Sequence, residues 1–193
     1  MVDVQTRAIN ILTKPEHEWN IIAVEQTDPR TLTVQYIAIL AAIPAAARFI
    51  GVSLIGYTTF LGTRVRAGIV SAFMTAIVEY ALTIGAVHVA ALVVDKLAPT
   101  FKSYPPTWIQ ALKLVTYAST AAWVGGIFYI VPALGPLAFL ASLYSIYLFY
   151  VGMAPMMKTP EDQVFPYMVV SSLIVVVLML VAGGLAGTLT ASL

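Results

Sequence analysis

The chain has 193 residues, of which 60% are hydrophobic and 10% are charged, and its formal net charge is +1. A soluble domain usually has about 25% charged residues, so this composition and the mean hydropathy of +0.91 predict an all-α, polytopic integral membrane protein forming a single bundle. The near-neutral charge argues against a nucleic-acid partner. The lack of cysteine excludes disulfides, thiolate catalysis and cysteine metal sites.

Residues 1–30 are expected to form short amphipathic helices before the bundle. Val4, Ala8 and Ile11 would share one face of a first helix, and Pro15 would stand in the first turn of a second. Charged residues interrupt every apolar run, so we expect no signal peptide here. Either these helices lie in the membrane surface, with Trp19 as an anchor at headgroup level, or they pack under the bundle.

Five later segments are each long and apolar enough to cross a bilayer, which takes roughly 20 residues. They cover residues 33–51, 68–94, 111–131, 135–156 and 167–188. Asp28 followed by Pro29 is typical of a helix start and is expected to cap the first span. The moderately apolar stretch from Val52 to Val65 either lies in the interface or re-enters the membrane. The sequence shows no internal repeat, so an inverted-repeat transporter is not indicated.

Basic residues predict the orientation of such a bundle. Of the ten lysines and arginines, seven fall on the side of the N-terminus and three on the other side. This bias favours a cytoplasmic N-terminus and an outward C-terminus. The residues on the side of the N-terminus are Arg7, Lys14, Arg30, Lys96, Lys102, Lys113 and Lys158. Those on the other side are Arg48, Arg64 and Arg66.

Glu79 is the most unusual residue of the second span, because it stands roughly midway between Arg66 and Asp95. An ionisable group at that depth costs several kcal/mol (about 3 on insertion scales) unless it faces protein or water. Ser71, Thr75, Glu79 and Thr83 recur every four residues, which predicts one polar stripe turned inward.

His88 is not expected to work with Glu79. A separation of nine residues is about 900° of helical rotation, so the two side chains point to opposite sides, about 13 Å apart along the axis. His88 shares a face with Asp95 instead. Arg48, on the antiparallel first span, is the first candidate partner of Glu79. The alternative is a hydrogen bond from Glu79 to a Tyr, Ser or Thr of another span.

Other motifs carry less information. Gly183 and Gly187 have the small-xxx-small spacing that permits close helix packing, within the bundle or between subunits. The chain has two histidines and no metal, phosphate-binding or hydrolase signature. We therefore expect no enzyme activity, no cofactor and no metal site.

Several stretches together resemble the bacterial branch of the Yip family, the Ypt/Rab-interacting membrane proteins. They are ILTKPEHEW, YIAILAAIPAAARFIG, LAPTF, QALKLVTYASTAAWVGGI, LGPLAFLASLYSIYLFYVGM and MKTPED, in this order along nearly the whole chain. The resemblance implies five spans with a cytoplasmic N-terminus. Ala121-Ala122 stands before Trp123 where the family pattern has Thr-Pro. The acidic-Leu-Tyr-Gly-Pro motif of eukaryotic relatives does not occur in the chain, so their GTPase partner is not carried over.

Two functions follow as hypotheses. The first is a non-enzymatic scaffold that binds membrane lipids or partner proteins, as a homo-oligomer or within a larger complex, in a bacterial inner membrane. The second is a small transporter or channel that uses Glu79 as an intramembrane proton or substrate site. A closed bundle favours the first, and a hydrated cavity that reaches Glu79 favours the second.

Overall fold

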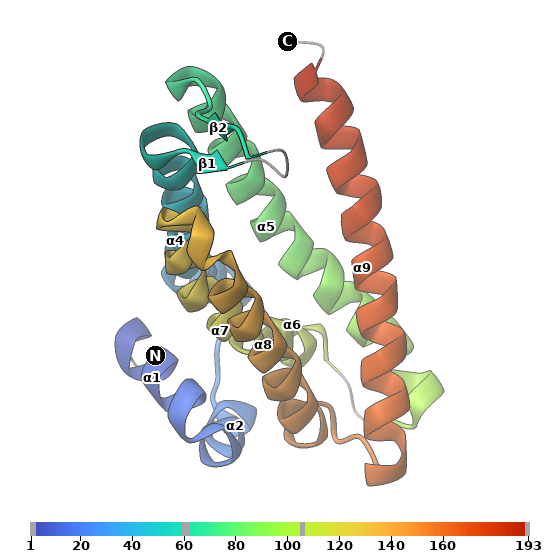
Figure 1. Ribbon diagram of the computed structural model, residues 1–193. Helices are drawn as coiled ribbons and strands as arrows, with labels where there is room; N and C mark the ends of the chain where they lie inside the picture. Colours follow the sequence, from blue (N-terminus) through green and yellow to red (C-terminus); the bar gives the residue numbers. More distant parts are fainter. Residues whose placement is uncertain (1–2, 59–61, 105–106, 192–193) are drawn as a thin grey trace.

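The computed structural model describes residues 3–58, 62–104 and 107–191, with side-chain surroundings up to residue 177. The chain is a bundle of helices with one short hairpin (Figure 1). The α-helices are α1 Val4–Thr13, α2 Pro15–Val24, α3 Pro29–Leu32, α4 Ala38–Ile50, α5 Ile69–Leu97, α6 Trp108–Ala118, α7 Thr120–Gly125, α8 Gly135–Met157 and α9 Glu161–Ala191. The strands are β1 Tyr57–Thr58 and β2 Arg64–Val65, and the π and 3-10 turns are Thr33–Ile37, Gly51–Ile55, Ala98–Phe101, Gly126–Ile130 and Pro132–Leu134.

Within the described residues, three helical runs are long and apolar enough to cross a membrane. They are Pro29–Ile55, Ile69–Phe101 and Pro132–Met157, and they overlap the first, second and fourth predicted spans. Asp28 caps the first run as expected, because its carboxylate accepts a hydrogen bond from the Thr31 backbone N–H at 3.0 Å. Hydrogen bonds from Thr31 hold the pKa of Asp28 below its ordinary value of 3.8.

The predicted third span is not one continuous helix. It is divided into α6, α7 and the 3-10 turn Gly126–Ile130. Ser119 stands at the first break, and its hydroxyl donates to the Val115 carbonyl at 2.8 Å, a bond that often bends helices. At the second break the backbone lies against α4, since a Cβ on Gly126 would be 2.6 Å from Pro44 Cβ. The regular helix α7 therefore ends at the point where the backbone comes close to α4.

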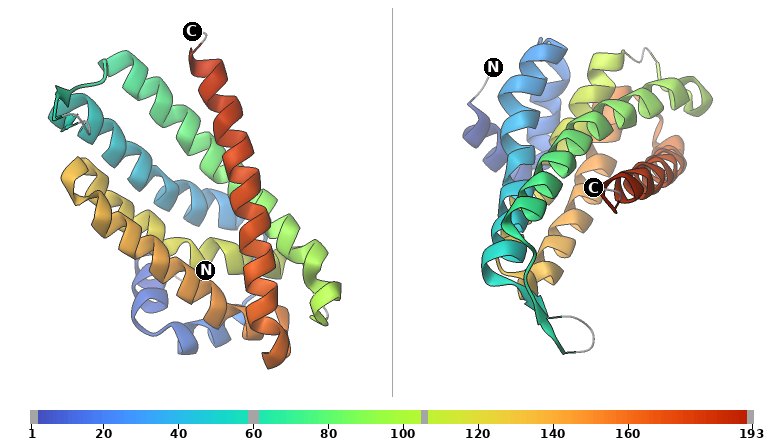
Figure 2. Two further views of the ribbon diagram at one scale, coloured as in Figure 1. Left: turned by 45° about the vertical axis from the view of Figure 1, so that its right-hand side comes forward. Right: turned by 90° about the horizontal axis from the view of Figure 1, so that it is seen from above.

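The helices join at two ends of the bundle. The β1–β2 hairpin lies at one end, while α1, α2 and the α5–α6 and α8–α9 connections lie at the other (Figure 1). Tyr57 pairs with Val65 and Thr58 with Arg64, so the described part of residues 52–65 is a turn followed by a hairpin. Helix α9 contacts α5, and Figures 1 and 2 show the two helices diverging toward the hairpin end.

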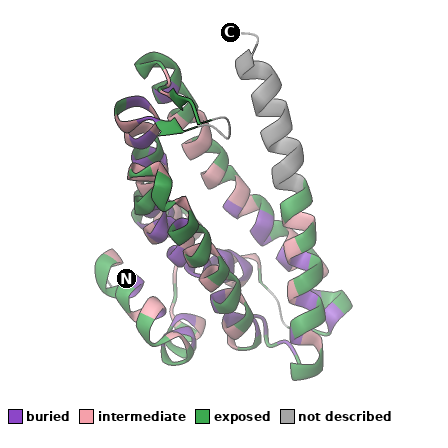
Figure 3. Cartoon of the chain, viewed as in Figure 1, coloured by how far each residue is buried: buried purple, intermediate pink, exposed green. Residues whose placement is uncertain are grey.

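Burial is concentrated away from the hairpin (Figure 3). Every residue from Ala111 to Ala118 in α6 is buried, which makes α6 the centre of the bundle. The buried residues of α5 are Ala72 near its start and Val87, Ala90, Ala91 and Val94 toward its end. Much of the hairpin-side half of α5 is therefore exposed on the surface of the chain.

The N-terminal helices pack against the bundle with their apolar side. Ala8, Ile11 and Ile22 are buried, and Trp19 is 0% exposed. The prediction that Trp19 anchors the chain at the headgroups is therefore corrected, because its indole packs on Gly152 of α8 and lies edge-on to Tyr117. The alternative reading, in which these helices pack under the bundle, agrees with the structure.

Candidate functional site

An open cavity of about 870 Å³ lies between α4, α5, α6, α7 and α9. We call it the α4–α5 groove. Its walls are mainly small or aliphatic, with alanines from α4 (Ala41, Ala45) and α5 (Ala86, Ala90). Small side chains leave the space between the helices unfilled. The volume falls within the range of about 300–1,000 Å³ typical of small-molecule sites.

Arg48 and Glu79 form an ion pair in this groove. Arg48 Nη1 donates to Glu79 Oε1 at 3.1 Å, and the side chains are 45% and 35% exposed. The contact expected from the sequence is therefore present. Arg48 stands in the last turn of α4, where a cation is favoured by the helix dipole. Its guanidinium also lies 4.7 Å from the centre of the Tyr129 ring, a cation–π contact that holds it in place.

The same pair also borders a second, smaller cavity of about 180 Å³ on the hairpin side. Ser71 and Thr75 line this cavity, and both are exposed. Their hydroxyls donate to carbonyls of their own chain segment, Ser71 to Gly68 and Thr75 to Ser71. The prediction that the polar stripe is turned inward is therefore wrong for Ser71 and Thr75, which lie exposed in the wall of this cavity. Their hydroxyls do not bridge to another helix.

Thr83 continues the stripe into the α4–α5 groove. Its hydroxyl donates to the Glu79 carbonyl at 2.8 Å, which again satisfies it within α5. Ser119 contributes a second hydroxyl group to the groove from the break between α6 and α7. The groove therefore combines apolar walls with one ion pair and two hydroxyl groups, which is the composition of a site for an amphiphile.

His88 and Asp95 lie outside both cavities. His88 Nε2 is 3.1 Å from the Thr33 hydroxyl and Nδ1 is 2.8 Å from the Ile84 carbonyl. Both ring nitrogens therefore have partners, and neither partner is Asp95 or Glu79. This position agrees with the prediction that His88 and Glu79 do not form a joint site.

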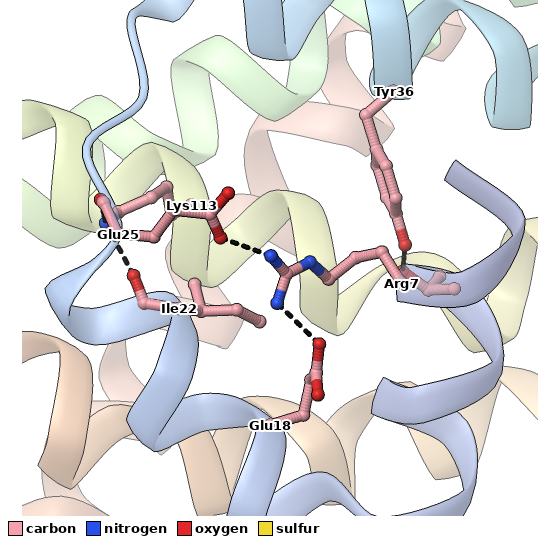
Figure 4. A network of polar contacts seen from close by, with 7 residues as sticks. Arg7, Glu18, Ile22, Glu25, Tyr36 and Lys113 are labelled. Atoms are coloured by element: carbon pink, nitrogen blue, oxygen red, sulfur yellow. Dashed lines mark hydrogen bonds and ion pairs between the residues drawn. The ribbon is translucent and has the colours of Figure 1, made fainter. Parts of the chain in front are cut away.

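A second polar cluster joins the N-terminal helices to the bundle (Figure 4). Arg7 of α1 is 1% exposed and reaches between Glu18 and Glu25. The Arg7–Glu18 pair measures 2.5 Å. Lys113 of α6 donates to the backbone carbonyls of Ile22 at 2.7 Å and Glu25 at 3.0 Å. These contacts fasten residues 4–25 to the central helix.

Sequence reasoning missed this buried cluster, because each charge had an ordinary alternative explanation. Arg7 and Lys113 are both explained in the sequence as basic residues on the side of the N-terminus. One signal was available: Glu18 and Glu25 lie four residues before and three after Ile22, on the face that also carries Trp19. Acidic residues on an otherwise apolar face indicate a buried cationic partner.

Two further expectations concern metals and helix packing. Among the described residues, the structure contains no group of three or more His, Cys, Asp or Glu side chains that could hold a metal ion. Gly183 and Gly187 belong to α9, but their surroundings lie outside the described residues. Their role in helix packing remains a prediction.

Comparison with known proteins gives one match. The family model of the Yip1 domain matches residues 9–183, which include part of α1, all of α2 and the whole groove. No curated protein and no solved structure matches the chain.

Proposed function

The chain belongs to the Yip1 domain family, and from this premise we propose a non-enzymatic membrane protein that organises the bilayer by holding lipid in the α4–α5 groove. Integral membrane character follows from the family and from the three apolar runs. The lipid-binding role is our proposal. In this role the chain acts as a scaffold for the bilayer, and its N-terminal helices form a fixed platform beneath the bundle.

One observation carries this proposal: the groove of about 870 Å³ is bounded by the apolar runs Pro29–Ile55 and Ile69–Phe101 themselves. A cavity between membrane-crossing helices is surrounded by acyl chains, which makes lipid the most abundant ligand at hand. The alanine walls suit a hydrocarbon chain. The Arg48–Glu79 pair supplies a polar end, so the groove has the two-sided character of a phospholipid.

The topology that goes with this proposal has five crossings, with the N-terminus in the cytoplasm of a bacterial cell and the chain in the inner membrane. The placement of α1, α2 and the α5–α6 and α8–α9 connections at one end of the bundle supports it, as does the excess of basic residues on that side. We further propose that Gly183 and Gly187 contribute to a homo-oligomer or to a larger complex.

The test uses two matched substitutions on α5. Ala86 lines the groove, and Ala81 is exposed on the same helix. Ala86→Phe should fill the groove and release bound lipid, whereas Ala81→Phe should leave it in place. Native mass spectrometry counts the phospholipid that remains bound to the full chain after extraction in polymer discs. Equal lipid content in both variants and the wild type would argue against a lipid site in the groove.

A second function, proton or solute passage past Glu79, has one observation in its favour. Glu79 lines both the groove and the smaller cavity, so a protonatable group separates two spaces along α5. The test is proton flux in proteoliposomes with an entrapped pH-sensitive dye and an imposed pH gradient. Glu79→Gln should abolish the flux and Glu161→Gln, at an exposed position, should not. Wild-type liposomes no leakier than empty ones would count against a proton path.

A further inference from the structure

We propose that the lipid held in the α4–α5 groove is selected by its headgroup, which carries both a phosphate and an ammonium with free N–H groups. The phosphate lies on Arg48 and the ammonium on Glu79. This inference rests on the proposed lipid-binding function and adds the identity of the ligand class. A phosphatidylethanolamine-type lipid has this chemistry.

The ion pair leaves donor and acceptor capacity on both sides. Arg48 uses Nη1 for Glu79, and Glu79 accepts that bond on Oε1. A guanidinium has five N–H donors and a carboxylate accepts on two oxygens, so each partner retains groups for a ligand without breaking the pair. Exposures of 45% and 35% leave both side chains accessible from the cavities that they line.

Charge complementarity then selects the headgroup. A cation and an anion stand side by side at 3.1 Å, and a zwitterion with adjacent phosphate and ammonium groups presents the opposite pair. Bonds from guanidinium to phosphate and from ammonium to carboxylate are both charge-assisted, and each is about twice as strong as a neutral hydrogen bond. An anionic lipid without an ammonium satisfies Arg48 alone. A quaternary ammonium has no N–H to donate to Glu79.

The remainder of the groove fits the hydrocarbon part of such a lipid. Along α5 the lining runs from Glu79 to Ala90, a separation of 11 residues or about 16 Å at the helical rise. Beyond Thr83 this wall is apolar, with Ala86, Val87 and Ala90. The smaller cavity, which Ser71 and Thr75 line, lies on the opposite, hairpin side of the ion pair. A lipid in this position would have its headgroup at the ion pair and its tail directed toward α6 at the bundle centre.

The experiment is a lipid competition on the full wild-type chain. The delipidated protein in detergent is mixed with equal amounts of phosphatidylethanolamine, phosphatidylglycerol and phosphatidylcholine with identical acyl chains, and bound lipid is counted by native mass spectrometry. Loss of one charge-assisted bond should lower binding about tenfold or more. Phosphatidylethanolamine should therefore dominate, and equal occupancy by the three lipids would overturn the inference.

Methylation of the ammonium gives a second test that needs no variant. The monomethyl and dimethyl lipids keep an N–H and should compete with the parent, and binding should fall at the trimethyl step. A gradual decline with each methyl group would indicate a steric effect and contradict donation to Glu79. In the protein, Glu79→Gln should remove the preference over phosphatidylglycerol. Arg48→Gln should weaken all three lipids, and the exposed controls Glu161→Gln and Arg30→Gln should do neither.

These outcomes separate the inference from the function on which it rests. If the three lipids bind equally and Ala86→Phe displaces them all, the groove holds lipid without headgroup selection and only the inference fails. If Ala86→Phe displaces none of them, the groove is not the lipid site and the proposed function fails as well.

Discussion

Trp19 of α2 lies directly on the backbone of Gly152 in α8: a Cβ added to Gly152 would be 2.5 Å from Trp19 Cε2 and 2.7 Å from Leu114 Cδ1. The indole is fully buried there. The absence of a side chain at Gly152 creates the space that Trp19 occupies. This contact joins the N-terminal platform to α8 across 133 residues of sequence.

Gly152→Ala should therefore destabilise the bundle, because overpacking of this kind costs about 1–3 kcal/mol. Gly85→Ala is the matched control, since a Cβ there meets nothing within 4 Å and Ala is favoured over Gly in a helix by about 0.5–1 kcal/mol. Thermal unfolding in detergent should show a lower midpoint for Gly152→Ala and an unchanged or higher one for Gly85→Ala. Equal midpoints would contradict the close contact with Trp19.

Arg7→Met should cost about 3–5 kcal/mol, because it leaves the Glu18 carboxylate buried without its cation. Arg7 and Glu18 are 1% and 2% exposed. The double variant Arg7→Met with Glu18→Met removes both charges and should recover much of this loss. Arg30→Met, at an exposed position, is the control. A double variant as unstable as Arg7→Met alone would mean that the pair itself does not account for the loss.

Lys113→Met should loosen residues 4–25 without unfolding the bundle. The substitution leaves the Ile22 and Glu25 carbonyls without their donor, at a cost of about 1–3 kcal/mol for buried groups. Limited proteolysis should cut the N-terminal helices faster in Lys113→Met than in Lys14→Met, where the lysine is exposed. Identical cleavage rates would show that Lys113 does not fasten this segment.

Glu79→Gln should change stability by less than about 1 kcal/mol, because partly exposed ion pairs contribute little and Arg48 retains its contact with Tyr129. Its effect is expected on lipid binding instead. Thermal unfolding with and without added phosphatidylethanolamine distinguishes an effect on stability from an effect on lipid binding. A large loss of stability in the lipid-free variant would make the ion pair a structural element of the bundle and not a binding site.

Hydropathy and helical geometry predicted much of the fold. The first, second and fourth spans follow from runs of about 20 apolar residues, and Pro15 begins α2 as expected. The Arg48–Glu79 contact was also predictable, because the antiparallel first and second spans bring these two residues near each other. The described residues contain three continuous helical runs of membrane-spanning length, and the predicted third span is divided into α6, α7 and a 3-10 turn.

The remaining features depend on contacts between distant parts of the chain. The sequence around Trp19 is typical of a residue at the membrane interface. Trp19 is buried because it packs into the space that Gly152 leaves in α8. The second break in the third segment lies where Gly126 approaches Pro44 of α4, a contact between distant parts of the chain. The groove itself arises where small side chains of α4 and α5 leave space between the helices, and a hydropathy plot contains no information on this packing.

The most direct measurement is a structure of the full chain in lipid nanodiscs that contain phosphatidylethanolamine. We predict an elongated density along Ala86 and Ala90, ending in a headgroup between Arg48 and Glu79. A groove filled by protein side chains, or by a continuous row of water molecules from the hairpin end past Glu79, would contradict lipid binding at this site; the water-filled result would favour passage past Glu79 instead.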